Sequence, residues 1–245
     1  MRRFARILGV GLASVGALAL IWVVIVWQWQ DPFTAIYTMW QQHQLEAQLN
    51  QEFRTFELRP TTGRVSLSAT GEARAIELGA ARLRRDAPVG QAIGRIVIPR
   101  LSLNMILVNG TDDASLRRGP GRDLRSYMPG QNRLIYIAGH RTTYLAPFSH
   151  IDQIRSGDPI RLKMPYATFN YRAVRHRIVR ATDLAVLRSP RHELVELQAC
   201  NPRFFATQRY IVYARLVSVD VGGGAPLTPQ ALATARASLR SSVAG

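Results

Sequence analysis

The sequence predicts an all-β domain, either a sandwich or a barrel, preceded by one N-terminal transmembrane helix and by a juxtamembrane helix and linker. Three observations support this architecture. Residues 7–30 are uncharged and mostly apolar, a helical apolar pattern follows them, and from Ile93 short β-like runs alternate with turn residues. Many short strands with few strong helical patterns are typical of sandwiches and barrels.

The apolar segment at residues 7–30 is long enough to span a bilayer. It has 24 positions, and about 20 apolar residues cross a hydrocarbon core. Arg2, Arg3 and Arg6 precede it without an acidic residue, which favours a cytoplasmic N-terminus at residues 1–6 and an extracellular domain after the helix. A cleaved signal peptide is the alternative, but its apolar region would be only about 7–15 residues long. The tryptophans near the outer end, where such rings favour the interface, are Trp22, Trp27 and Trp29.

The juxtamembrane region covers residues 31–92. Asp31 and Pro32 form a helix start signal, an N-cap followed by proline at the first helical position. Apolar residues at three- to five-residue steps then predict a helix to about Leu58, whose stripe packs on the domain or lies along the bilayer surface. The remaining residues mix charge, alanine and glycine, and are interpreted as a linker with a helical turn near residues 73–85.

The β domain is predicted at residues 93–220, and a tail at residues 221–245 follows it. Seven runs are apolar and rich in β-forming residues, and proline, glycine and asparagine separate them. The tail is small and polar, and is interpreted either as a weak helix after Pro229 or as a frayed end. The predicted strands are residues 94–98, 103–108, 133–138, 159–164, 168–180, 194–199 and 209–219.

The net charge of +16 raises the question of a nucleic-acid partner. The arginines are scattered, with no dense basic tract, and the domain is predicted to face away from the genome, so nucleic acid is not expected to bind. Asp112, Asp113 and Asp152 are too sparse for a calcium site, which takes six to eight oxygens. The sequence therefore predicts no metal and no cofactor.

One cysteine, Cys200, is the most informative single residue. A lone thiol cannot form an intrachain disulfide, and outside the cell it is at risk of oxidation unless it is buried or used. His140 lies upstream and Arg209 downstream, and a thiol with a histidine and a cation is suited to nucleophilic acyl transfer. Arg203 is the alternative cation, because it is nearer in sequence. The other interpretation is that Cys200 is a small buried apolar residue.

Several segments together resemble the sortase family, the cysteine transpeptidases of the bacterial surface. The opening strand, the histidine block, the cysteine block and the arginine block occur in the family's order and spacing, and the histidine block is most similar to class E sortases of actinobacteria. The resemblance covers over half of the chain, from Ile93 to Val219. The matching segments are residues 93–99, 138–148, 197–202 and 208–210.

The resemblance implies a sortase-like closed β-barrel of about eight strands with short helices. It implies catalytic roles for His140, Cys200 and Arg209. It also implies a reaction in which a sorting signal such as LPxTG or LAxTG is cleaved between Thr and Gly through a thioester. The partners would be surface proteins that carry a C-terminal sorting signal, and an amine of a peptidoglycan precursor or cell-wall peptide. The candidate substrate-binding residues are Thr142, Thr143, Tyr144 and Ala199.

The sequence departs from the family pattern directly before the cysteine. Sortases usually have Thr-Leu-x-Thr-Cys, whereas this chain has Glu196 and Ala199 in place of the two threonines. This departure leaves a second interpretation open, a non-catalytic membrane-tethered β domain that binds wall or protein partners. A third, an L,D-transpeptidase, requires a histidine very close to the cysteine within a Ser-His-Gly-x-x-Asn-Cys-like run. Residues 191–200 do not supply that run, although His192 is present.

Overall fold

A computed structural model describes residues 2–29, 32–57, 68–222 and 225–243, and its core is a closed β-barrel. The strand order around the barrel is β1-β2-β3-β4-β7-β8-β6-β5. Two neighbouring pairs, β2/β3 and β4/β7, are parallel, and the other pairs are antiparallel. The strands are β1 (Ala92–Ile98), β2 (Leu103–Asn109), β3 (Gly121–Arg122), β4 (Leu134–Ala138), β5 (Pro159–Met164), β6 (Ala167–Arg180), β7 (Leu194–Asn201) and β8 (Gln208–Asp220).

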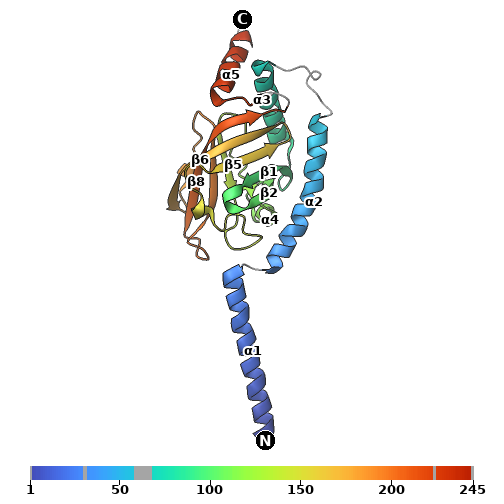
Figure 1. Cartoon of the computed structure of the whole chain (residues 1–245), viewed down its shortest axis with the longest axis vertical. Helices are drawn as coiled ribbons and strands as arrows, with labels where there is room; N and C mark the ends of the chain where they lie inside the picture. The colour runs from blue at the N-terminus through green and yellow to red at the C-terminus, as the bar shows by residue number, and fades with distance from the viewer. Residues whose placement is uncertain (1, 30–31, 58–67, 223–224, 244–245) are drawn as a thin grey trace.

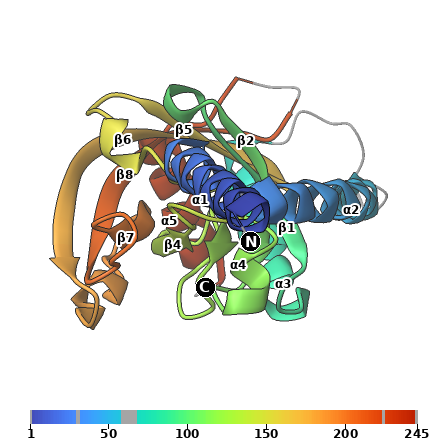
Figure 2. The same ribbon diagram turned by 90° about the horizontal axis from the view of Figure 1, so that it is seen from below.

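Helices surround the barrel at both ends and along one side (Figure 1). The helix α1 projects from one end of the barrel, α2 runs along its side, and α3 and α5 lie together at the end away from α1. Seen from below, α2 lies on the β1 and β2 side, and β6, β7 and β8 form the other side (Figure 2). The helices are α1 (Arg2–Trp29), α2 (Pro32–Glu57), α3 (Ala69–Asp86), α4 (Asp113–Leu116) and α5 (Pro229–Val243), with single 3₁₀ turns η1 (Pro99–Leu101), η2 (Ile151–Gln153) and η3 (Leu184–Leu187).

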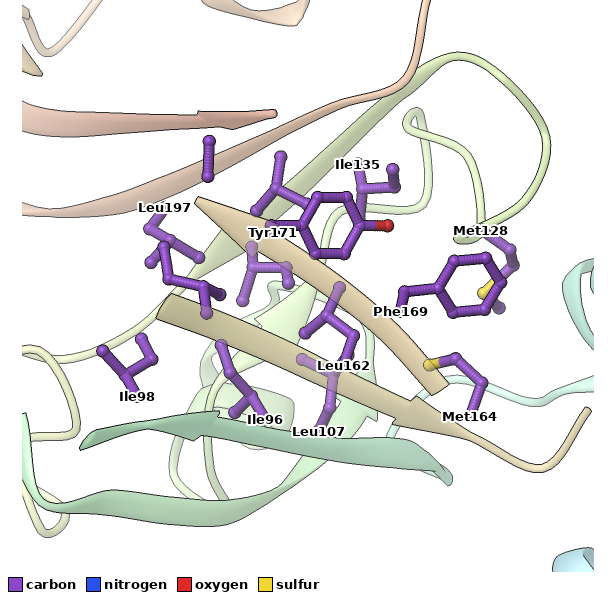
Figure 3. Close-up of a cluster of buried hydrophobic side chains, with 14 of the residues drawn as sticks. Ile96, Ile98, Leu107, Met128, Ile135, Leu162, Met164, Phe169, Tyr171 and Leu197 are labelled. Carbon is purple, nitrogen blue, oxygen red and sulfur yellow. The ribbon is translucent and has the colours of Figure 1, made fainter. Parts of the chain in front are cut away.

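The barrel interior is a packed apolar core that fixes the strands. Side chains from different strands point into it, among them Ile96 of β1, Leu162 of β5 and Leu197 of β7 (Figure 3). All three are fully buried. Complete burial of such a side chain contributes about 1.5–3 kcal/mol, so the inward positions hold each strand in a single register. The outward positions are thereby fixed as well, because successive side chains of a strand alternate between faces.

The closed barrel confirms the predicted fold class, and each of the seven predicted runs forms a strand. The eighth strand, β3, was not predicted, because it has two residues and carries no alternating pattern. β7 extends further than expected, so that Cys200 lies within the strand rather than after it.

Two regions flanking the barrel are helical: the first is longer than the helical turn expected near residues 73–85, and the second confirms the helix after Pro229 that was one of two alternatives. Residues 69–86, interpreted as part of a linker, form the 18-residue helix α3. Its buried face joins the main core through Ala73, Ile76, Ala80 and Leu83, a helical spacing that the surrounding charges obscure. The tail forms α5, whose Leu232 is 1% exposed because it packs into the same core. Packing against the core contributes to the stability of both helices.

The juxtamembrane helix α2 packs on the barrel with part of its apolar stripe. Leu45 and Leu49 are buried against Ile106 and Val108 of β2. Gln42 adds specific polar contacts, because its Oε1 accepts a hydrogen bond from the Ile106 N–H at 2.7 Å. Residues 58–63, where the helix was expected to end, and the expected cap Asp31 lie outside the described residues. The first helix, α1, is apolar and exposed from Arg2 to Val24, and this stretch is long enough to cross a membrane.

Candidate active site

Three neighbouring strands bring the histidine, the cysteine and the arginine together. Cys200 on β7 is paired directly with Arg209 on β8. On the other side of β7, the parallel ladder with β4 pairs Ala138 with Gln198, and the Gly139 N–H continues it by donating to the Gln198 carbonyl at 3.0 Å. His140, one residue further, therefore lies beside Cys200, since neighbouring strands are about 4.8 Å apart.

The three side chains lie on the same face of the sheet, outside the barrel. On β7, Val195, Leu197 and Ala199 belong to the interior core, so Cys200 points outward. Directly paired residues share a face, and their Cβ atoms are about 4.5–5.5 Å apart, so Arg209 accompanies the cysteine. Ile135 and Ile137 of β4 face the interior core, and continuing this alternation two residues past the end of β4 places His140 outward. This outer face therefore combines a half-buried thiol, an imidazole and a guanidinium.

The Arg209 guanidinium is held beside the turn that joins β7 to β8. Its Nη1 donates to the carbonyl oxygens of Ala206 at 2.7 Å and Gln208 at 2.8 Å. Arg203 lies in the same turn, and its Nε is buried without a hydrogen-bond partner. Arg209 is the residue in direct register with the thiol, whereas Arg203 lies outside the ladder.

The environment of His140 favours the neutral imidazole. Burial lowers the pKa of His140 below its usual value, Asp113 opposes this, and the positive charge of Arg117 lowers the pKa further. The ring Nε2 is buried and has no hydrogen-bond partner in the structure. A neutral imidazole with an uncommitted nitrogen can accept a proton from a thiol and return it to a leaving amine.

Tyr144 packs against the histidine ring and links it to the juxtamembrane helix. The two ring centroids are 5.1 Å apart. Tyr144, Leu145 and Ala146 all have positive φ angles, of 53°, 59° and 35°, a conformation that is uncommon without glycine. Contacts with α2 support this loop, because the Tyr144 N–H donates to Thr34 Oγ1 at 3.0 Å. The tyrosine ring also meets Tyr37 edge-on, at a centroid distance of 6.4 Å.

The other expected substrate-binding residues fall in two places. Thr142 and Thr143 lie in the same loop as Tyr144 and are half-buried. Ala199 is fully buried in the interior core, on the face opposite to Cys200. The missing threonine hydroxyl at Ala199 is therefore a change in the core and not on the outer face that carries Cys200. Within the described part of the chain, no group of three or more histidine, cysteine or acidic side chains could hold a metal ion.

Sequence reasoning did not identify Arg141 as a site residue. Its buried guanidinium donates from Nη1 to the Cys200 carbonyl at 3.2 Å and to Asn201 Oδ1 at 2.8 Å, and from Nη2 to Asp152 Oδ1 at 2.7 Å. The contacts join the loop after His140 to the end of β7. Its place next to the histidine was the only available signal, because the partners are remote in sequence.

Replacing Arg141 with methionine should lower the free energy of unfolding by about 2–3 kcal/mol. This range corresponds to the loss of hydrogen bonds to a charged group, and methionine keeps part of the apolar volume. Chemical denaturation of the full chain in detergent measures the change. The exposed Arg188→Met is the matched control, and its effect should stay within about 0.5 kcal/mol. Equal effects of the two substitutions would show that the Arg141 contacts do not stabilise the site.

Comparisons with known proteins agree with this geometry. A family model described as a sortase domain matches residues 96–217. Sortase D of Bacillus subtilis (strain 168) is 34% identical over 134 residues, which cover 53% of this chain and 66% of that protein, just under two thirds of its length.

Solved structures are similar as well. The crystal structure of Sortase E1 from Streptomyces coelicolor with a tripeptide in the active site is similar with a TM-score of 0.51 and 26% identity, over 55% of this chain and 92% of that one. A Clostridium perfringens Sortase D5 transpeptidase has a TM-score of 0.56 at 20% identity, over 72% and 98% of the two chains, and this match concerns the fold.

Proposed function

This chain belongs to the sortase family, and from that premise we propose that it is a membrane-anchored cysteine transpeptidase. It cleaves an LPxTG- or LAxTG-like sorting signal between Thr and Gly and transfers the protein to an amine of a cell-wall peptide. The observation that carries the proposal is the side-by-side order of His140, two residues after the end of β4, Cys200 on β7 and Arg209 on β8. The tripeptide in the active site of the similar Sortase E1 supports a peptide as the substrate class.

In the first half of the reaction, His140 accepts the thiol proton and the Cys200 sulfur attacks the carbonyl carbon of the Thr–Gly bond. Negative charge develops on the carbonyl oxygen, and the guanidinium of Arg209 stabilises it, since this planar cation presents several N–H donors. The carbon–nitrogen bond then breaks. His140 returns the proton to the departing glycine amine, and the acyl group remains on sulfur as a thioester.

In the second half, an incoming wall amine attacks the thioester carbon. The amine loses a proton to His140, a new amide bond forms, and Cys200 leaves as a thiolate that takes the proton back. No oxidant or cofactor enters either half. The Arg141 contacts to the Cys200 carbonyl and Asn201 hold the end of β7 in place throughout both steps.

The apolar helix α1 would anchor the enzyme with residues 1–6 in the cytoplasm and the barrel outside the cell. This assignment is supported by the exposed apolar stretch Arg2–Val24 and by the arginines before it. A basic domain at this place is also attracted to anionic lipids and wall polymers.

The test uses full-length protein in detergent and quenched peptides that contain LPATG or LAATG. We expect cleavage between Thr and Gly, a Cys200 thioester in the intact mass spectrum, and a ligated product when triglycine is added as amine. Omitting the amine should leave hydrolysis alone. The absence of both turnover and adduct across these peptides would contradict the proposed activity.

The non-catalytic interpretation loses its main support. It depended on the missing threonine at Ala199, and that side chain faces the core rather than the outer face that carries Cys200. Thiol alkylation separates the two functions, because an enzyme whose Cys200 is activated by His140 should react with iodoacetamide faster than a free cysteine at pH 7. An unreactive Cys200 in the folded protein would favour a binding domain.

The acid limb of the kcat/KM profile against pH should shift in opposite directions in Arg117→Gln and Asp113→Asn. The active state holds one proton between Cys200 and His140, so activity falls on the acid side when the imidazole is protonated as well. Removing Arg117 removes a cation that lowers the pKa of His140, so this limb moves to higher pH. Removing Asp113 takes away an anion that raises the pKa, so the limb moves to lower pH.

Profiles of kcat/KM between pH 5 and 8 measure these shifts for the free enzyme. Arg188→Gln, an exposed change elsewhere on the surface, is the control and should leave the limb in place. Shifts of both variants in the same direction would show that His140 does not determine the acid limb.

A further inference from the structure

The ring of His140 is held by packing rather than by a hydrogen bond at Nε2. In the described part of the chain this buried nitrogen has no hydrogen-bond partner. The Tyr144 ring lies against the imidazole, with the centroids 5.1 Å apart and the planes tilted by 39°. A catalytic base is generally oriented by a third group, and the tyrosine ring is in contact with this one. The position of Tyr144 therefore affects the direction of the imidazole.

The backbone that carries Tyr144 depends on contacts from outside its loop. Tyr144, Leu145 and Ala146 have consecutive positive φ angles although none of them is glycine. Such conformations persist where the surrounding structure determines them. Inside the loop, the Ala146 N–H donates to the Thr143 carbonyl at 2.8 Å. The Tyr144 N–H has its partner elsewhere, so an external acceptor completes the conformation.

The first turns of α2 supply that acceptor. Thr34 Oγ1 accepts the hydrogen bond from the Tyr144 N–H at 3.0 Å, across a separation of 110 residues in the sequence. Tyr37, a neighbour of Thr34 on the helix surface at i+3, meets the Tyr144 ring edge-on at a centroid distance of 6.4 Å. The helix therefore contacts both the backbone and the ring of this tyrosine.

The same part of α2 holds the charged neighbours of the histidine. The fully buried Thr38 hydroxyl donates to the Arg117 carbonyl at 2.9 Å. The Arg117 guanidinium lies over the Tyr144 ring, 5.6 Å from its centroid, and forms an ion pair with Asp113 at 2.5 Å. Both charges act on the pKa of His140. The helix thus supports the packing partner of the base and its local charges together.

We propose that Thr34 is a positioning residue, which holds Tyr144 against the imidazole of His140 and so keeps the catalytic base in its working orientation. Thr34 acts through the tyrosine and takes no part in proton transfer. Because the acceptor for the Tyr144 N–H comes from α2 and not from a strand, full activity requires the juxtamembrane helix as well as the barrel. The inference rests on the proposed role of His140 as the base of a peptide-cleaving enzyme.

Two substitutions at one position separate the hydroxyl of Thr34 from its shape. Thr34→Val keeps the branched side chain without the acceptor, whereas Thr34→Ser keeps the acceptor. With LPATG and full-length enzyme in detergent, kcat of Thr34→Val should fall about 10–100-fold, as expected for a displaced catalytic group. KM should stay within about threefold, and Thr34→Ser should retain kcat within about threefold. Thr55→Val is the matched control on the same helix, where the hydroxyl donates to the Gln51 carbonyl, and it should keep the wild-type kcat.

Hydrogen exchange followed by mass spectrometry observes the loop without depending on turnover. Fragments that cover residues 141–149 should exchange about tenfold faster in Thr34→Val than in the wild type, because the Tyr144 N–H loses its acceptor and the loop opens more often. Thr34→Ser should exchange like the wild type. Fragments from β5 and β6 should be unchanged in all variants, which distinguishes a released loop from general destabilisation.

The acid limb of the kcat/KM profile is a readout that a merely structural role would not move. Burial is the main cause that lowers the pKa of His140, Asp113 opposes it, and Arg117 lowers the pKa further. Release of the loop admits water to the ring, so the pKa rises and the limb should move to higher pH in Thr34→Val but not in Thr34→Ser. The variants leave every titratable or charged group around the ring in the chain. These groups are Arg141 and Tyr144 of its own loop, Asp113 and Arg117 of the α4 region, Tyr37 of α2, Cys200 of β7 and Arg209 of β8.

The possible results separate this inference from the proposed function. Equal kcat and equal exchange in Thr34→Val and the wild type would overturn the positioning role and leave the sortase activity standing. Faster exchange with an unchanged kcat would overturn it as well, because the loop would then be held by α2 without orienting the base. An equal loss of kcat in Thr34→Ser would exclude the hydrogen bond as the cause. No cleavage of any peptide by the wild type would reject the proposed function, and this inference with it.

Discussion

Replacing Cys200 with alanine should abolish peptide cleavage and ligation, with a loss of at least about four orders of magnitude in kcat. A nucleophile that acts as a unit with its base typically accounts for a loss of this size or larger when removed. Alanine cannot form the thioester, and no second cysteine exists in the chain to replace it. The same quenched peptides and intact mass spectrometry measure the loss of both turnover and adduct.

Stability should change little, which separates this prediction from unfolding. Cys200 points outward from β7 and is half-buried, so the substitution leaves no cavity in the barrel core. We expect a change in the free energy of unfolding below about 1 kcal/mol. Val217→Ala, an exposed position on β8, serves as a control and should retain activity within about twofold. Residual turnover of Cys200→Ala above one per cent would exclude thioester catalysis by this residue.

Replacing Arg209 with glutamine should lower kcat by about 10²–10³-fold, the effect of removing one donor from an oxyanion site and equivalent to about 3–4 kcal/mol. KM should change much less, because the interaction forms mainly in the transition state. Arg209→Lys should recover only part of the loss, since a lysine has no planar fork of donors. Steady-state kinetics with LPATG measures both constants.

Arg203 is the matched comparison for this prediction. It lies in the turn after β7 and not in register with Cys200, so Arg203→Gln should cost less than about tenfold in kcat. The buried Nε of Arg203 has no hydrogen-bond partner. Arg203 therefore also has a donor for the oxyanion, and the comparison tests which of the two arginines supplies it. A larger loss for Arg203→Gln than for Arg209→Gln would transfer the oxyanion role to Arg203.

The sequence pattern predicts most strands of the barrel but only some of the helices around it. β5, from Pro159 to Met164, was predicted with its observed bounds, because a proline marks the beginning of this run of β-forming residues and a turn follows its end. β3 could not be predicted, since two residues carry no periodicity. The pattern of α3 is visible at Ala73, Ile76, Ala80 and Leu83, but its apolar side chains are small and charges lie between them. Packing against α5 and the barrel decides its structure.

In the site, too, local sequence patterns identify some residues, whereas other contacts depend on segments that are remote in the sequence. The cysteine, histidine and arginine blocks are local patterns, and they indicated His140, Cys200 and Arg209. The direction of Ala199 was predictable in principle, because it follows from alternation along β7. The contacts of Arg141 depend on the registers of strands that are remote in the sequence. No pattern within a short stretch of sequence reveals those registers.

The hydrogen bond from the Tyr144 N–H to Thr34 Oγ1 ties the loop beside His140 to the beginning of α2. Thr34 follows the end of α1 by only five residues, a chain length of at most about 18 Å. With α1 in the membrane, as proposed, the candidate site would therefore lie close to the lipid headgroups. Substrates attached to the same membrane would meet the enzyme by lateral diffusion in two dimensions, whereas chains in bulk solution would rarely reach it.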